Sequence, residues 1–91
     1  MLFRSLAPDD AYILDSLGWV EFRLGRMEQA LNTLQRAYGL KADAEIAAHL
    51  GEVLWQSGRP DEARKLWRSA NEKDPKNETL RSTLQRLQIQ L

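Results

Sequence analysis

The chain has 91 residues, with 13 Lys and Arg against 13 Asp and Glu, so its formal net charge is zero. A chain of this length forms one domain at most, and a neutral chain has no overall field to attract nucleic acid or an anionic membrane. The absence of cysteine excludes disulfides and thiolate metal sites, but it selects neither cytosol nor periplasm.

The first ten residues, MLFRSLAPDD, do not have the pattern of a signal peptide, because they lack an apolar core segment and are broken by Pro8. Leu6 and Pro8 lie where a preceding repeat would finish, so residues 1–10 are predicted to be a remnant of such a repeat or a linker. No apolar stretch approaches the roughly 20 residues needed to span a bilayer. We therefore expect no direct membrane contact by this segment.

Residues 11–43 are predicted to form a helical hairpin, with helices at about 10–24 and 27–40. Gly25 is expected to end the first helix, because glycine readily adopts the left-handed conformation that follows a helix C-terminus. The packed stripe of the first helix follows i, i+3, i+4 and i+7 spacing: Leu14, Leu17, Gly18 and Glu21. The stripe of the second helix is Met27, Ala30, Leu31, Leu34, Ala37 and Tyr38.

Residues 44–77 repeat this organisation, with helices predicted at about 44–57 and 60–73. Gly58 is expected to end the first of them, and Pro60 suits the first turn of the second, where no amide partner is lost. The two stripes are Ala47, Leu50, Gly51 and Leu54, then Ala63, Leu66, Trp67 and Ala70.

A single constant offset along the sequence superimposes the two units. It aligns Leu17-Gly18 with Leu50-Gly51, Gly25 with Gly58, and Ala30 with Ala63. Small residues match in identity and large ones only in apolar character, as expected where helices approach closely at fixed points. The last segment, 78–91, has leucines at helical spacing, and we predict a helix at about 77–90 that covers the end of the repeat stack. These leucines are Leu80, Leu84, Leu87 and Leu91.

These motifs resemble the tetratricopeptide repeat, a helical hairpin of about 34 residues with the pattern W-x2-L-G-x2-Y, A-x3-F and P. The first unit reads Leu14-x2-Leu17-Gly18-x2-Glu21 and Ala30-x3-Leu34; the second reads Ala47-x2-Leu50-Gly51-x2-Leu54, Ala63-x3-Trp67 and Pro75. Glu21 departs from the usual aromatic residue, which implies that this edge is exposed or contacts another segment. The resemblance covers about 11–77 and implies an all-α, right-handed helical-hairpin solenoid: two repeats, 11–43 and 44–77, and a capping helix, 78–91.

Asp15–Trp19 and His49–Trp55 also resemble the last repeats of long tetratricopeptide proteins of Gram-negative envelopes, several of which are outer-membrane lipoproteins that act as adaptors. This resemblance implies a location on the periplasmic side of the outer membrane; without it, the cytoplasm is expected. Repeat arrays generally need at least three units for stability. We therefore expect a fragment of a larger scaffold protein, or else self-association through the N-terminal face.

In tetratricopeptide arrays the first helices of the repeats line a concave groove, which implies a binding module for a protein or peptide partner. The predicted groove is aromatic in the first unit and acidic with an aromatic end in the second, so it suits apolar anchors and a basic group. Its residues are Tyr12, Asp15, Trp19, Phe22, Arg23, Glu45, His49, Glu52 and Trp55. The carboxylate clamp of one subclass, built from Lys and Asn, is absent, since Asp15, Trp19, Ala48 and Glu52 occupy these faces.

Several alternatives stay open. Trp19 and Trp55 could pack between repeats, and the whole segment could be a structural cap of a solenoid whose binding site lies elsewhere. A basic cluster of Arg64, Lys65 and Arg68 would suit an RNA-binding repeat, but the equivalent residues of the first unit, Leu31, Asn32 and Gln35, do not continue it. We therefore expect no nucleic acid partner.

His49 has Glu45 and Glu52 one helical turn to either side, but a charged helical face explains this spacing better than a metal site. The serines lack the context of a nucleophile, and the glycines do not form a phosphate-binding loop. We expect no enzyme activity, no metal and no cofactor.

Overall fold

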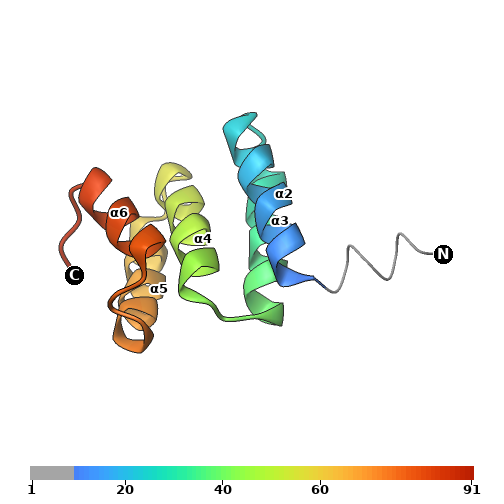
Figure 1. The fold of residues 1–91 in the computed structure, drawn as a ribbon. Helices are drawn as coiled ribbons and strands as arrows, with labels where there is room; N and C mark the ends of the chain where they lie inside the picture. The colour runs from blue at the N-terminus through green and yellow to red at the C-terminus, as the bar shows by residue number, and fades with distance from the viewer. Residues whose placement is uncertain (1–9) are drawn as a thin grey trace.

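The computed structural model describes residues 10–91 as a stack of two helical hairpins followed by one further helix (Figure 1). The helices are α2 (Ala11–Arg23), α3 (Met27–Leu40), α4 (Ala44–Gln56), α5 (Pro60–Lys73) and α6 (Glu78–Arg86). The predicted all-α solenoid is confirmed, and residues 10–91 contain no strand. Within the same range, no helix has the length and apolar character required to cross a bilayer. The segment predicted to be a repeat remnant lies, apart from Asp10, outside the described residues.

The first helix of each hairpin and the final helix α6 begin with a side-chain cap. Asp10 accepts hydrogen bonds from the backbone amides of Tyr12 and Ile13, Asp43 accepts one from Glu45, and Asn77 accepts one from Leu80. Such caps satisfy amides that have no partner inside the helix. The second helices begin without a side-chain cap, at Arg26 and Arg59, and α5 has Pro60 in its first turn instead.

The same three helices also end alike. Gly25 and Gly58 have φ values of 83° and 82°, and Gln88 takes the equivalent left-handed conformation at 59°. The next amide, that of Ile89, donates to the Leu84 carbonyl at 2.9 Å and closes the turn. The predicted extension of the last helix to residue 90 is therefore wrong: α6 stops at Arg86, and the chain turns so that Ile89 is buried.

Within each hairpin the two helices approach closely at a glycine of the first helix. Gly18 of α2 faces Leu34 of α3, and Gly51 of α4 faces the indole of Trp67 in α5. Trp67 is fully buried, and its ring N–H donates to the Ala48 carbonyl at 3.4 Å. At each of these two contacts, a large side chain of the second helix is seated on a glycine of the first helix.

Two details of α2 differ from the predicted packed stripe. Leu17 is exposed rather than buried, although Leu14 and Gly18 beside it are buried. Glu21, which replaces the usual aromatic residue, accepts a hydrogen bond of 2.7 Å from the Thr33 hydroxyl of α3. Its departure from the repeat pattern is therefore accommodated by a polar contact inside its own hairpin.

Replacement of Gly51 by Ala is expected to lower the free energy of unfolding by about 1–3 kcal/mol, because the new methyl group overlaps the Trp67 ring. Gly18→Ala should cost less, since its methyl meets the flexible end of Leu34, with Cγ at 2.6 Å. Urea denaturation of both variants measures the difference.

Gly39 supplies the matched control, because it lies in α3, is exposed and has no heavy atom near an added methyl. Gly39→Ala should raise stability by up to about 1 kcal/mol through helix propensity alone. Equal effects of Gly51→Ala and Gly39→Ala would contradict the close-approach interpretation.

Candidate functional site

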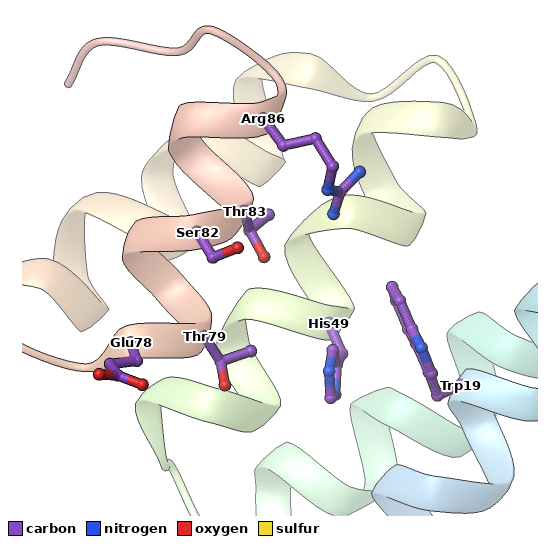
Figure 2. Close-up of a pocket in the computed structure, with 7 residues that line it drawn as sticks. All are labelled: Trp19, His49, Glu78, Thr79, Ser82, Thr83 and Arg86. Carbon is purple, nitrogen blue, oxygen red and sulfur yellow. The ribbon is translucent and has the colours of Figure 1, made fainter.

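An open groove runs across α2, α4 and α6, and Figure 2 shows one of its two pockets. It consists of two pockets, of about 320 and 490 Å³, which share Trp19 and Arg86 and therefore adjoin. The first is lined by Trp19, His49, Glu78, Thr79, Ser82, Thr83 and Arg86, and the second by Trp19, Phe22, Arg23, Glu52 and Arg86. The groove thus joins both hairpins to the final helix.

Trp19 is fixed at the centre of this groove by neighbouring rings. Its indole stacks on the His49 imidazole, with ring centroids 4.3 Å apart and planes at 27°, and it packs against Phe22 at 5.0 Å. The Nδ1 atom of His49 lies 2.8 Å from a carboxylate oxygen of the buried Asp15. This oxygen can accept a hydrogen bond from a protonated Nδ1. Asp15 therefore orients His49, and His49 supports Trp19.

Glu52 and Arg86 form a second polar link across the groove. The Arg86 guanidinium donates to both carboxylate oxygens of Glu52, at 2.6 and 2.9 Å, and Glu52 is buried. This bidentate arrangement raises the pKa of Arg86 above its already high value, chiefly through the hydrogen bonds. Both this pair and Asp15–His49 join side chains one repeat length apart in the sequence, on adjacent first helices of successive units.

These two pairs correct the electrostatic character expected of the groove. The sequence suggested an acidic surface around Glu52, but both Asp15 and Glu52 are buried against a partner from the first helix of the next unit. Next to Trp19 the groove is lined by the guanidinium groups of Arg23 and Arg86 together with the Glu52 carboxylate, which is paired with Arg86. The Glu52 carboxylate is thus paired with a cation that lies one repeat away in the sequence.

The structure gathers part of the predicted set in the groove. Trp19, Phe22, Arg23, His49 and Glu52 line it, and Asp15 lies behind His49. Tyr12, Glu45 and Trp55 do not line either pocket. Trp55 packs instead against Trp67, with centroids 5.8 Å apart, beside the main core cluster. Trp55 therefore packs within its own hairpin, whereas Trp19 lines both pockets and also stacks on His49 of the next unit.

One wall of the groove was not predicted. Glu78, Thr79, Ser82, Thr83 and Arg86 of α6 form it, facing Trp19 and His49 across α4 (Figure 2). The sequence assigned a role only to the leucines of this last helix, and its polar side was expected to face solvent. The signal that could have revealed it is the spacing of Glu52 and Arg86, since an acid and a base one repeat apart can meet on adjacent helices.

Residues of the alternative metal and RNA sites form contacts within the described part of the chain. No group of three His, Cys, Asp or Glu side chains in residues 10–91 is arranged to hold a metal ion. His49 is paired with Asp15, and Glu52 with Arg86. In the basic cluster of α5, the Arg64 guanidinium donates to the carbonyl of Gln90 at 2.7 Å, which ties the C-terminal turn to α5.

Tyr12 forms a hydrogen bond at the junction between the two hairpins. Its hydroxyl donates to Asp43 at 2.6 Å, and Asp43 at the same time caps α4. The acceptor carboxylate raises the pKa of Tyr12 to about 12, and the same hydrogen bond lowers the pKa of Asp43 below its ordinary value. Tyr12 therefore connects the start of α2 to the start of α4 and does not contribute to the groove.

Stacked helical hairpins with a continuous groove define a helical-repeat solenoid of the kind that binds other proteins. A family model described as tetratricopeptide repeat matches residues 21–87, so the chain belongs to the tetratricopeptide repeat family. Repeats of this family indicate a protein–protein interaction module, and they are generally non-catalytic.

The chain is also similar to the TPR repeat-containing protein PA4667 of Pseudomonas aeruginosa, with 48% identity over 49 residues. The match covers 54% of this chain and 8% of that protein. The name states only that the relative contains the repeat, so the narrower resemblance to envelope lipoproteins stays a prediction.

Arg86→Ala is expected to lower the free energy of unfolding by about 1–3 kcal/mol, because it leaves the buried Glu52 carboxylate without its donors. Hydrogen exchange should show faster opening of α6 in this variant. Arg81→Ala, at an exposed position of the same helix, is the control and should change stability little. Equal effects of the two substitutions would contradict a structural role for the pair.

Titration of Tyr12 tests the junction between the hairpins. In a Tyr38→Phe background, phenolate absorbance should give a pKa of about 12, falling toward the ordinary value of about 10 in Asp43→Asn. The bond requires the protonated phenol and the ionised Asp43 carboxylate. At neutral pH its stabilising contribution is complete, and it is lost as pH rises from about 10 toward 12. Asn retains the helix cap, so a titration unchanged by Asp43→Asn would show that the bond is not formed.

Proposed function

We propose that this chain binds a partner protein by accommodating an extended or helical segment in the groove between α2, α4 and α6. The observation that carries this proposal is the position of Trp19, which is shared by both pockets and held by His49 and Phe22. Tryptophan is enriched among the residues that dominate binding energy at protein interfaces. A ring already fixed in place loses little conformational entropy when a partner covers it.

The charges of the groove indicate the character of the segment. Arg23 and Arg86 lie next to Trp19, whereas Glu78 stands toward the opposite end of α6 (Figure 2). A segment with an apolar anchor on Trp19 and a carboxylate toward Arg23 complements this arrangement. Arg86 already has Glu52 as its partner, so Arg23 is the arginine more open to pairing with a new carboxylate.

Selection from a phage-displayed random peptide library on the intact chain tests this proposal. Enriched peptides should carry an aromatic or aliphatic anchor with an acidic neighbour. Their affinity should fall by at least about tenfold on Trp19→Ala, the loss typical of an interface anchor. Fluorescence anisotropy of labelled peptides measures the affinity, and thermal melts record whether the variant is folded.

Two matched variants complete the experiment. Lys65→Ala changes a residue on the other side of the second hairpin, beside Leu50 and Leu66, and should leave peptide affinity unchanged. Trp55→Ala should lower the melting temperature more than Trp19→Ala, because Trp55 packs against Trp67. Peptides that lose affinity on Lys65→Ala but not on Trp19→Ala would refute the groove. The absence of any enriched peptide would favour the alternative that this segment is a structural cap.

A further inference from the structure

The three helices that form the groove run in the same direction, so their charged ends lie at the same edges. Figure 1 shows α2, α4 and α6 beginning on one side of the molecule, with α4 between the other two. An acidic residue occupies the first turn of α4 and of α6, Glu45 and Glu78, and an arginine occupies the last turn of α2 and of α6, Arg23 and Arg86. Each placement suits the dipole of its own helix. Because the helices are parallel, the two signs of charge gather at opposite edges of the groove.

Two of these charges line the groove and have no internal partner. Glu45 lines neither pocket, and Arg86 is paired with Glu52. Glu78 and Arg23 line one pocket each, are exposed, and form no ion pair within the described part of the chain. The groove therefore has an available carboxylate at one edge and an available guanidinium at the other.

Helix geometry gives the position of each charge relative to Trp19. Trp19 and Arg86 are equivalent residues, counted from the starts of α2 and α6. Glu78 precedes Arg86 by just over two helical turns, which is about 12 Å along the helix axis. Arg23 follows Trp19 by about 6 Å. Along the groove, the free carboxylate is thus about twice as far from the indole as the free guanidinium.

Between these two charges, the wall formed by α6 presents hydroxyl groups. Thr79, Ser82 and Thr83 line the pocket opposite Trp19 and His49 (Figure 2). Hydroxyls donate and accept hydrogen bonds, so they can bond to the free backbone amides and carbonyls of an extended segment. A helical segment has already paired these backbone groups internally. The middle of the groove therefore favours an extended occupant.

We propose that the groove recognises one order of charges in an extended segment of a partner protein: a Lys or Arg at Glu78, an apolar residue on Trp19, and an Asp or Glu at Arg23. At roughly 3.4 Å per extended residue, the base lies about three or four residues from the apolar anchor, and the acid lies about two residues from it on the other side. This inference rests on the binding proposed above and specifies the partner's sequence. Trp19 supplies affinity, whereas Glu78 and Arg23 determine specificity.

Three labelled peptides that differ only at two charged positions test this order. Each has a phenylalanine anchor, with lysine and aspartate at the two spacings, aspartate at both, or lysine at both. Fluorescence anisotropy at low salt should show that the natural chain binds the mixed peptide roughly threefold or more tightly than either of the others, a margin within the range of exposed ion pairs. The margin should shrink at high salt, because exposed charges are screened.

Charge reversals in the chain should change the preferred peptide. Glu78→Lys should favour the doubly acidic peptide, and Arg23→Glu should favour the doubly basic one. Glu72→Lys and Arg81→Glu are matched controls at exposed positions that line neither pocket of the groove, and both should keep the preference for the mixed peptide. Thermal melts record folding. Where a reversal does not fold, Glu78→Gln or Arg23→Gln takes its place and should remove the preference at its own position.

Other results would overturn the charge order. Equal affinity of the natural chain for all three peptides would do so, as would a preference that Glu78→Lys and Arg23→Glu leave unchanged. Tighter binding of the doubly acidic peptide by the natural chain would assign the second carboxylate to Arg86 instead.

Trp19→Ala separates this inference from the binding proposal, since it should weaken all three peptides alike. If it weakens none of them, or if no peptide binds the natural chain, binding in the groove is refuted together with the charge order. If it weakens all three while the charge order fails, the binding proposal stands and only the charge order is lost.

Discussion

The structure depends on the close approach of two helices at one glycine in each hairpin. At Gly51 the Trp67 ring occupies the space that any side chain would need, and at Gly18 Leu34 does so. This contact sets the separation of the paired helices and directs the large residues of the second helix into the core. The faces of α2 and α4 that do not contact their paired helix are consequently left free. One of these faces meets the neighbouring unit, and the other forms the groove.

Most of the fold could be predicted because it follows from short-range rules. Glycines at helix ends, Pro60, the helical spacing of apolar residues and the constant offset between the two units all reflect organisation within one hairpin. They placed the first four helices almost to their observed ends. The exception is the end of α6. The leucine spacing extends to Leu91, yet the chain turns at Gln88, a residue that carries no glycine-like signal for a left-handed conformation. That turn depends on burial of Ile89, a tertiary contact that periodicity does not encode.

The groove was harder to predict because its properties arise between repeats. By residue type, Asp15 and Glu52 are acidic members of the predicted groove. Their partners come from the first helix of the next unit, so both carboxylates are buried in contacts between units. Trp19 and Trp55 show the same limit. Both are tryptophans on first helices, and only the position of Trp67 draws Trp55 toward the core while Trp19 faces the groove.

The two polar pairs that join side chains one repeat apart have a consequence for cooperativity. A repeat array behaves as a one-dimensional chain, in which stability divides into an internal term for each unit and a coupling term for each boundary. Asp15–His49 and Glu52–Arg86 lie across the two boundaries and contribute only to coupling. The same side chains lie in or directly behind the groove. A partner bound as proposed across α2, α4 and α6 would therefore add to the same coupling term and make unfolding of the described units more cooperative.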